Sequence, residues 1–176
     1  MKWEFIESEL MTASINAAFQ RADVYADPKA TTDHRRPVLR EQLASSLRNL
    51  ARQYSTAVSS KQHKLNIAAI ADDLTRAFNG SGLLRADRFR IGIAQKALNL
   101  YLKYLWCLDK IMTPPHCPFD DGIIDELPLS EQQKKDLKWT ALDSLDGYQT
   151  LVDAGLEKIK GTKHASLSDW ELETWN

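Results

Sequence analysis

The amino-acid sequence predicts an all-α protein, a compact single-domain helical bundle covering residues 1–176. In several long segments, apolar residues recur every three or four positions, which is the spacing of one helix face. These segments are separated by short stretches containing glycine, proline, asparagine or aspartate. The length of 176 residues, with 43% hydrophobic and 27% charged residues, suits one soluble domain with a single sizeable core.

The first two helices are expected in the N-terminal third of the chain. Residues 4–22 carry apolar side chains at helical spacing, show no strand pattern and end before the turn signal Asp27-Pro28. A second helix is expected from Pro37, which suits a first helical position, to about Tyr54. The side of this helix opposite its leucines carries Arg36, Arg40, Arg48 and Arg52. These arginines would form either a solvated surface or a stripe that contacts phosphates.

The middle of the chain predicts a buried central helix. Residues 61–78 form a helical pattern that stops at Asn79-Gly80-Ser81-Gly82, and short helical material leads to Gly92. The helix that opens after Gly92 is apolar around most of its circumference, which is typical of a core helix. Its polar residues lie on one face of the helix: Lys96, Asn99, Lys103 and Lys110.

The C-terminal third predicts further helices. Ser130 and Gln133 resemble a capping box that opens a helix through Leu137, Leu142 and Leu145, continuing through Leu151 and Leu156 with a break near Gly147. The segment from Gly161 onward is polar apart from Leu167, Trp170, Leu172 and Trp175. Tryptophans in such a terminal segment would ordinarily pack on the body of the protein.

Lys96 and Asp120 form a candidate reactive pair. Burial of a lysine, the positive end of a helix and a nearby cation such as Lys103 all lower the pKa of its amine, and a neutral amine is a nucleophile. About 24 residues after Lys96, Asp120 ends a run that contains three prolines, Pro114, Pro115 and Pro118. This rigid loop can return a carboxylate to the start of the helix. Separately, each residue has an ordinary interpretation: Lys96 as a surface lysine and Asp120 as a helix cap.

Residues 65–125 resemble the helix-hairpin-helix base-excision DNA glycosylases, especially the 8-oxoguanine glycosylases and their archaeal relatives. Gly92 matches the first hairpin glycine, Lys96 the catalytic lysine four residues later, and Pro118-Phe119-Asp120 the family's Pro-Val-Asp motif. The sequence departs from the family at Ala94, which replaces the second hairpin glycine, and at Phe119, which replaces the valine. The resemblance implies a helix-hairpin-helix-like DNA-binding element within an all-α fold.

The resemblance also implies an activity. The protein would be a DNA N-glycosylase, with or without lyase activity at apurinic or apyrimidinic sites, that flips out and excises a modified base. Lys96 and Asp120 would be catalytic. The cations Arg85, Arg88, Arg90 and Lys103, together with Gly92, would bind DNA, and the arginines would gather where a DNA backbone meets the amides at the helix start. Asn99, Trp170 and Trp175 are candidates for the base pocket, where the two tryptophans would form an aromatic wall beside the flipped base instead of packing on the body of the protein.

The expected substrate is double-stranded DNA that carries 8-oxoguanine or a hypermodified phage base such as glucosylated hydroxymethylcytosine. The second case would make the protein an antiviral defence enzyme rather than a repair enzyme. No metal or other cofactor is expected, and the protein is expected to act as a monomer. The alternative is a non-catalytic helical module that binds DNA or another protein.

Charge and cysteine content are consistent with an intracellular DNA-associated protein. The net charge is −1, but residues 34–110 hold 14 Lys+Arg against 5 Asp+Glu, whereas the rest hold 9 against 19. This asymmetry predicts a basic surface facing a polyanion, although acidic helix surfaces are also common. Two cysteines and an N-terminus without an apolar run predict a reduced, cytoplasmic compartment, and Lys96, Asn99 and Lys103 interrupt the longest apolar stretch, so no membrane span is expected.

Overall fold

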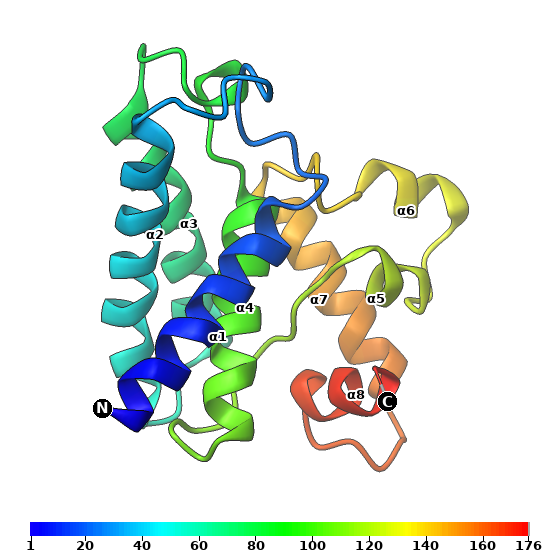
Figure 1. Ribbon diagram of the computed structural model, residues 1–176. Helices are drawn as coiled ribbons and strands as arrows, with labels where there is room; N and C mark the ends of the chain where they lie inside the picture. The colour runs from blue at the N-terminus through cyan, green and yellow to red at the C-terminus, as the bar shows by residue number, and fades with distance from the viewer. Residues whose placement is uncertain (176) are drawn as a thin grey trace.

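The computed structural model describes residues 1–175, which contain eight α-helices, two 3-10 helices and no strand (Figure 1). The α-helices are α1 (Lys2–Phe19), α2 (Arg35–Ala51), α3 (Ser60–Phe78), α4 (Ile91–Cys107), α5 (Asp121–Asp125), α6 (Glu131–Asp136), α7 (Leu145–Ile159) and α8 (Leu167–Thr174), and the 3-10 helices are η1 (Arg52–Ser55) and η2 (Arg85–Asp87). The all-α prediction is therefore confirmed.

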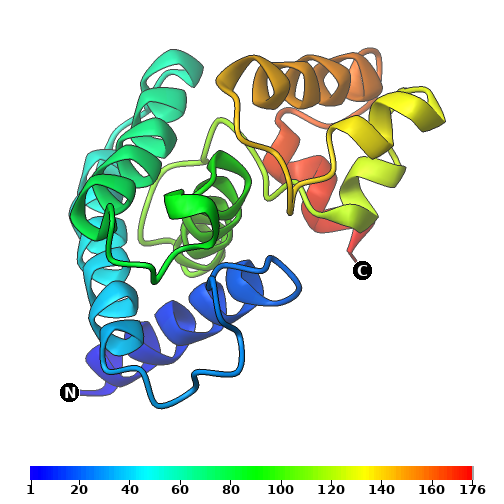
Figure 2. The same ribbon diagram turned by 90° about the horizontal axis from the view of Figure 1, so that it is seen from above.

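Helix α4 occupies the centre of the fold, as its sequence predicts. It contacts α1, α2, α3 and α7, and Figure 2 shows it between the α1–α3 group and the α5–α8 group. Its first nine residues, 91–99, are all buried, including Gln95, Lys96 and Asn99. Three polar side chains in the core need polar partners, and their partners define the candidate site described below.

The helices differ from the sequence prediction mainly between residues 131 and 160. The capping box of Ser130 and Gln133 is confirmed, but α6 ends at Asp136. Residues 137–144 are not helical, and a new helix, α7, begins with Ser144 as its cap, where the Ser144 hydroxyl accepts from the Gly147 amide at 3.0 Å. The expected break near Gly147 is wrong, because Gly147 lies inside the capped first turn of α7.

The non-helical segment 137–144 packs against the start of α4. Trp139 is fully buried, and its carbonyl oxygen would lie 1.8 Å from a Cβ built on Gly92. The Gly92 amide donates to the Leu142 carbonyl at 2.8 Å, and the Ile91 amide donates to an Asp143 carboxylate oxygen at 3.1 Å. Gly92 therefore permits a close backbone contact, and the first two amides of α4 have acceptors within the protein.

The C-terminal segment adds a helix that periodicity alone does not reveal. Ser166 caps α8 by accepting from the Asp169 amide at 3.1 Å, and Figure 1 places α8 beside the end of α7. Over residues 1–175, none of the helices combines the length and apolar character needed to cross a membrane.

Candidate active site

A pocket of about 290 Å³ opens beside α4, between α1, α8 and the proline-rich loop. It is lined by five charged residues, three of them basic and two acidic, together with six other residues. The charged residues are Arg21, Lys96, Lys103, Asp120 and Glu171, and the others are Ala17, Gln20, Leu100, Tyr104, Pro118 and Trp175. The polar groups thus converge from four separate parts of the chain, a pattern typical of a ligand site.

Lys96 and Asp120 meet in this pocket. The Lys96 Nζ lies 3.5 Å from Asp120 Oδ2, and their side chains are only 9% and 16% exposed. The other carboxylate oxygen, Oδ1, accepts from the Ile123 amide at 3.2 Å and so caps α5. The two interpretations of Asp120, as a helix cap and as the partner of Lys96, are therefore compatible, because each uses a different oxygen.

The environment of Lys96 lowers the pKa of its amine below the ordinary lysine value. Burial is the main cause, and the positive charge of Arg21 acts in the same direction, while the Asp120 carboxylate opposes both. The Trp139 ring, with its centroid 4.1 Å from Nζ, also favours the charged form. The net effect moves Lys96 towards the neutral state that a nucleophile requires.

Lys103 does not have the role expected of it, which was to lower the pKa of Lys96 as a nearby cation. Its Nζ lies 2.8 Å from Glu171 Oε2, and the side chains of Lys103 and Glu171 are 13% and 1% exposed. Because this carboxylate compensates its charge, Lys103 contributes little to the field at Lys96, and Arg21 supplies the second positive charge instead. Burial raises the pKa of Glu171, while Lys103 opposes that shift.

Gln95 links the helix that carries Lys96 to the loop that carries Asp120. Its Nε2 donates to the Phe119 carbonyl at 2.7 Å, and its Oε1 accepts from the Phe119 amide at 3.2 Å. Gln95 immediately precedes Lys96, and Phe119 immediately precedes Asp120. One buried side chain therefore fixes the proline-rich loop against α4 directly beside Lys96 and Asp120.

Asn99 lies in a buried polar network behind the pocket and does not line it. Its Oδ1 is 2.7 Å from His63 Nε2, and its Nδ2 donates to Gln95 Oε1 at 3.2 Å and to the Tyr148 hydroxyl at 3.1 Å. The Tyr148 hydroxyl lies 2.9 Å from His116 Nδ1. Burial lowers the pKa of His63 to about 4 and that of His116 to about 2, so both are neutral near pH 7. Asn99 therefore holds the residues behind the pocket in place and is not positioned to contact a ligand in it.

The two C-terminal tryptophans occupy different places. Trp170 is only 6% exposed and belongs to the hydrophobic core. Trp175 is 62% exposed, lines the pocket, and has its ring centroid 5.7 Å from Lys103 Nζ. Of the two, Trp175 is thus the one positioned to contact a ligand.

The three arginines before Gly92 are held by different partners. Arg88 pairs with both Asp72 and Asp143, at 2.8 and 3.0 Å. Arg85 pairs with Asp23 at 2.6 Å, and the Arg90 guanidinium donates to the Ala22 carbonyl. The expectation that the amides at the start of α4 are free to meet a DNA backbone is not met, because Leu142 and Asp143 already accept from them.

Sequence reasoning did not identify Arg21, Gln95 or Glu171. The sequence could have indicated that Glu171 is buried. It follows Trp170 and lies four residues after Leu167, so all three residues share one helix face. Arg21 follows the end of α1, and nothing in the local pattern connects it with Lys96.

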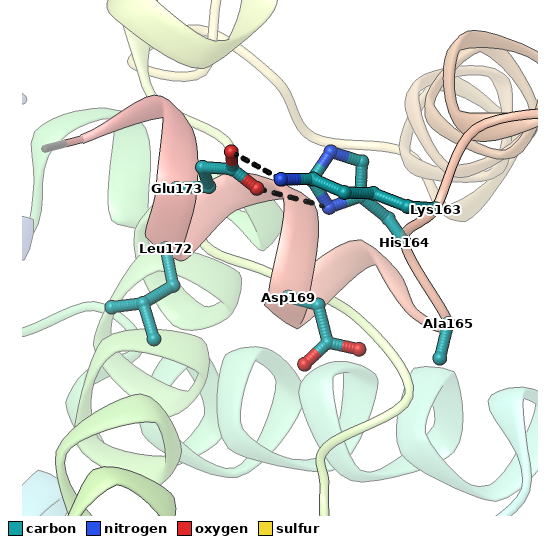
Figure 3. A pocket seen from close by; sticks show the side chains of 6 residues that line it. All are labelled: Lys163, His164, Ala165, Asp169, Leu172 and Glu173. Atoms are coloured by element: carbon teal, nitrogen blue, oxygen red, sulfur yellow. Dashed lines mark hydrogen bonds and ion pairs between the residues drawn. The ribbon is translucent and has the colours of Figure 1, made fainter.

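A second, more open hollow of about 430 Å³ lies at the C-terminal end of the chain, and Figure 3 shows six residues that line it. There Glu173 faces Lys163 Nζ at 2.8 Å and His164 Nδ1 at 3.6 Å. Glu173 compensates the charge of Lys163 at an exposed surface. The hollow brings together no enclosed nucleophile and carboxylate, so the Lys96 pocket is the better candidate for chemistry.

Comparison of the chain with family models, with curated proteins and with solved structures gave no match.

Proposed function

We propose that this protein is a DNA glycosylase that extrudes a modified base from double-stranded DNA and excises it, with Lys96 as the nucleophile and Asp120 as its partner. The observation that carries the proposal is the 3.5 Å approach of Lys96 Nζ to Asp120 Oδ2 inside a pocket. A module that only binds DNA needs no enclosed amine next to a carboxylate.

The arrangement supports a stepwise reaction. Asp120 accepts a proton from the Lys96 ammonium, and the neutral amine attacks C1′ of the extruded nucleotide as the bond between C1′ and the base breaks. The base leaves with the electron pair of that bond and takes up the proton that Asp120 holds, which restores the Asp120 carboxylate. Asp120 stabilises the positive charge that develops on the sugar. The C1′–O4′ bond of the sugar ring then breaks as a proton passes from the amine nitrogen to O4′, which gives a protonated Schiff base between C1′ and Lys96. Loss of a proton from C2′ and departure of the 3′ phosphate break the C3′–O bond by β-elimination and nick the strand.

The pocket also supports the binding step. Its volume of about 290 Å³ is close to the lower end of the range of about 300–1,000 Å³ that small-ligand sites occupy. The exposed ring of Trp175 lines the pocket and offers a flat surface on which an extruded base can stack. Lys103 and Glu171 then form a charged wall beside the base.

In this proposal α3, α4 and the connection between them form the helix-hairpin-helix-like element. Arg85 and Arg90 face the DNA backbone, whereas Lys103 lies in the pocket wall and Arg88 contributes least because two carboxylates compensate its charge. Gly92 acts by allowing Trp139 to approach α4, which in turn places the indole ring next to Lys96.

Borohydride trapping on a panel of duplexes tests the proposal. The duplexes carry 8-oxoguanine, glucosylated hydroxymethylcytosine, an abasic site or no modification, and borohydride reduces a Schiff base to a stable covalent adduct. We expect an adduct with the wild type that is lost in Lys96→Ala and retained in Lys61→Ala, a matched change at an exposed lysine of α3. The modified base that responds identifies the substrate and separates a repair role from antiviral defence.

Glycosylase activity is also measured directly as release of the free base, since excision without a stable Schiff base leaves no adduct. If no duplex releases a base or forms an adduct, and the wild type binds DNA as well as Lys96→Ala and Asp120→Asn do, the catalytic proposal is wrong. The non-catalytic DNA-binding module then takes its place.

A further inference from the structure

A third hollow adjoins the Lys96 pocket at Arg21, and we call it the arginine hollow. It has a volume of about 340 Å³, and the residues that line it include Arg21, Asp23, Arg85, Arg90 and Thr140. Arg21 lines this hollow and the Lys96 pocket alike. Three cations from two distant parts of the sequence therefore meet beside the candidate nucleophile.

Backbone pairing between the segment after α1 and the segment before α4 builds the arginine hollow. The Arg85 amide donates to the Val24 carbonyl at 2.9 Å, and the Ala26 amide donates to the Leu83 carbonyl at 2.9 Å. Tyr25 and Leu84 form an antiparallel bridge between them, and both segments lie at the same end of the molecule in Figure 1. The Arg90 guanidinium adds a bond to the Ala22 carbonyl.

The charges in the arginine hollow do not balance. It contains three guanidinium groups and one carboxylate, that of Asp23, which pairs with Arg85 at 2.6 Å. Among residues 1–175, the Arg21 guanidinium has no hydrogen-bond or ion-pair partner. Its positive charge reaches Lys96 and acts on the amine there. An anion bound in the hollow would compensate this excess of positive charge.

The backbone at this point is also unusual. Arg21 and Asp23 have φ angles of 61° and 45°, in the left-handed region that residues with a Cβ rarely adopt. Such conformations persist where the surrounding structure fixes them, and they occur often at binding sites. Here they accompany the turn that directs Arg21 to the boundary between the two hollows.

We propose that the arginine hollow binds a phosphodiester group of the DNA strand, next to the nucleotide whose sugar occupies the Lys96 pocket. This inference rests on the proposed glycosylase function for the identity of the strand. A guanidinium presents paired N–H donors that match two phosphate oxygens, and Arg21 is free to make this contact. The amides at the start of α4, the other possible phosphate site, already have protein acceptors.

The salt dependence of DNA binding tests this proposal without requiring catalysis. The probe is a duplex with a tetrahydrofuran abasic analogue, which forms no Schiff base, and its dissociation constant is measured over a series of potassium chloride concentrations. We expect Arg21→Gln to weaken binding at low salt roughly tenfold and to reduce the slope of log K against log [salt] by about one.

Arg76→Gln is the control, because it removes the same charge from an exposed residue of α3 and should leave the slope unchanged. Arg21→Lys keeps the charge without the paired donors, so it should keep the slope but bind more weakly than the wild type.

Each outcome decides between the proposals. If Arg21→Gln matches Arg76→Gln in affinity and slope while the wild type still forms the borohydride adduct, the phosphate assignment is wrong and the glycosylase function stands. If Arg21→Gln alone weakens DNA binding, and the wild type neither releases a base from any duplex nor forms an adduct, the phosphate site is supported and the glycosylase function is contradicted. If the wild type binds no duplex, both proposals fail. Binding of inorganic phosphate is measured as well. If free phosphate binds in an Arg21-dependent way while Arg21→Gln leaves DNA binding unchanged, the hollow binds a small anion and the phosphodiester proposal is wrong.

Discussion

The side chain of Gln95 makes hydrogen bonds to both backbone groups of Phe119, at 2.7 Å to the carbonyl and 3.2 Å to the amide. Both residues are buried and both stand immediately before a candidate catalytic residue, Lys96 or Asp120. The paired contacts restrict sliding of the loop along α4 more strongly than a single bond would. Gln95 is therefore a positioning residue, which acts on the distance between Lys96 and Asp120.

Replacing Gln95 by leucine should slow chemistry more than it weakens DNA binding. The change leaves the Phe119 amide and carbonyl without partners, so we expect a loss of roughly 1–3 kcal/mol in the free energy of unfolding. Single-turnover adduct formation should slow while the dissociation constant for abasic-analogue DNA changes little. Gln132→Leu, at an exposed position of α6, is the control. An unchanged trapping rate in folded Gln95→Leu would contradict the positioning role.

Asp120→Asn and Asp120→Ala should differ in stability but not in activity. Asparagine caps a helix about as well as aspartate, so Asp120→Asn should preserve α5, whereas Asp120→Ala should lose about 1 kcal/mol. Both changes remove the carboxylate that faces Lys96 and should abolish or strongly reduce base excision. Urea denaturation and single-turnover excision measure the two effects. Excision by Asp120→Asn at the wild-type rate would limit Asp120 to its capping role.

Gly92→Ala should destabilise the protein strongly. The added Cβ would lie 1.8 Å from the Trp139 carbonyl oxygen and 3.2 Å from the Leu142 Cβ, so the 139–142 segment must move. Overpacking of this kind costs about 1–3 kcal/mol and occasionally more. Gly122→Ala is the matched control, since its nearest neighbour, an Asp120 carboxylate oxygen, is 3.7 Å away. Chemical denaturation compares the two, and equal stability would show that Trp139 does not constrain α4.

Stability should fall on acidification because of the buried histidines. His63 has a pKa of about 4 in the native state, compared with 6.5 for an ordinary histidine. Between these values the unfolded chain binds more protons, so the free energy of unfolding decreases as the pH falls from 6.5 towards 4, by up to about 1.4 kcal/mol per pH unit for each such histidine. His116, with a native pKa of about 2, adds to the same trend and extends it to lower pH.

Urea denaturation at a series of pH values measures this effect. His63→Gln should flatten the pH dependence between 6.5 and 4, whereas His34→Gln, which removes an exposed histidine, should leave it as in the wild type. A pH dependence equal in the wild type and in His63→Gln would show that His63 is not the buried neutral group responsible.

The sequence by itself determined the helical class, the central helix and several helix ends. These features depend on local periodicity and on local caps, such as the Ser130–Gln133 box and the stop of α3 before Asn79. It also predicted that Asp120 returns to the start of the helix that carries Lys96, because a proline-rich loop limits how far Asp120 can lie from the helix it follows. Their meeting at 3.5 Å agrees with that reasoning.

Only the tertiary structure decided which other groups surround Lys96. Arg21, Lys103 and Glu171 come from α4 and from near opposite ends of the chain, and no local pattern specifies that they line one pocket. The structure also placed Asn99 in the buried network and used the first amides of α4 for internal contacts. The physical reason is that such contacts depend on how helices cross and on where loops return. Many weak packing interactions across the whole core determine those features together.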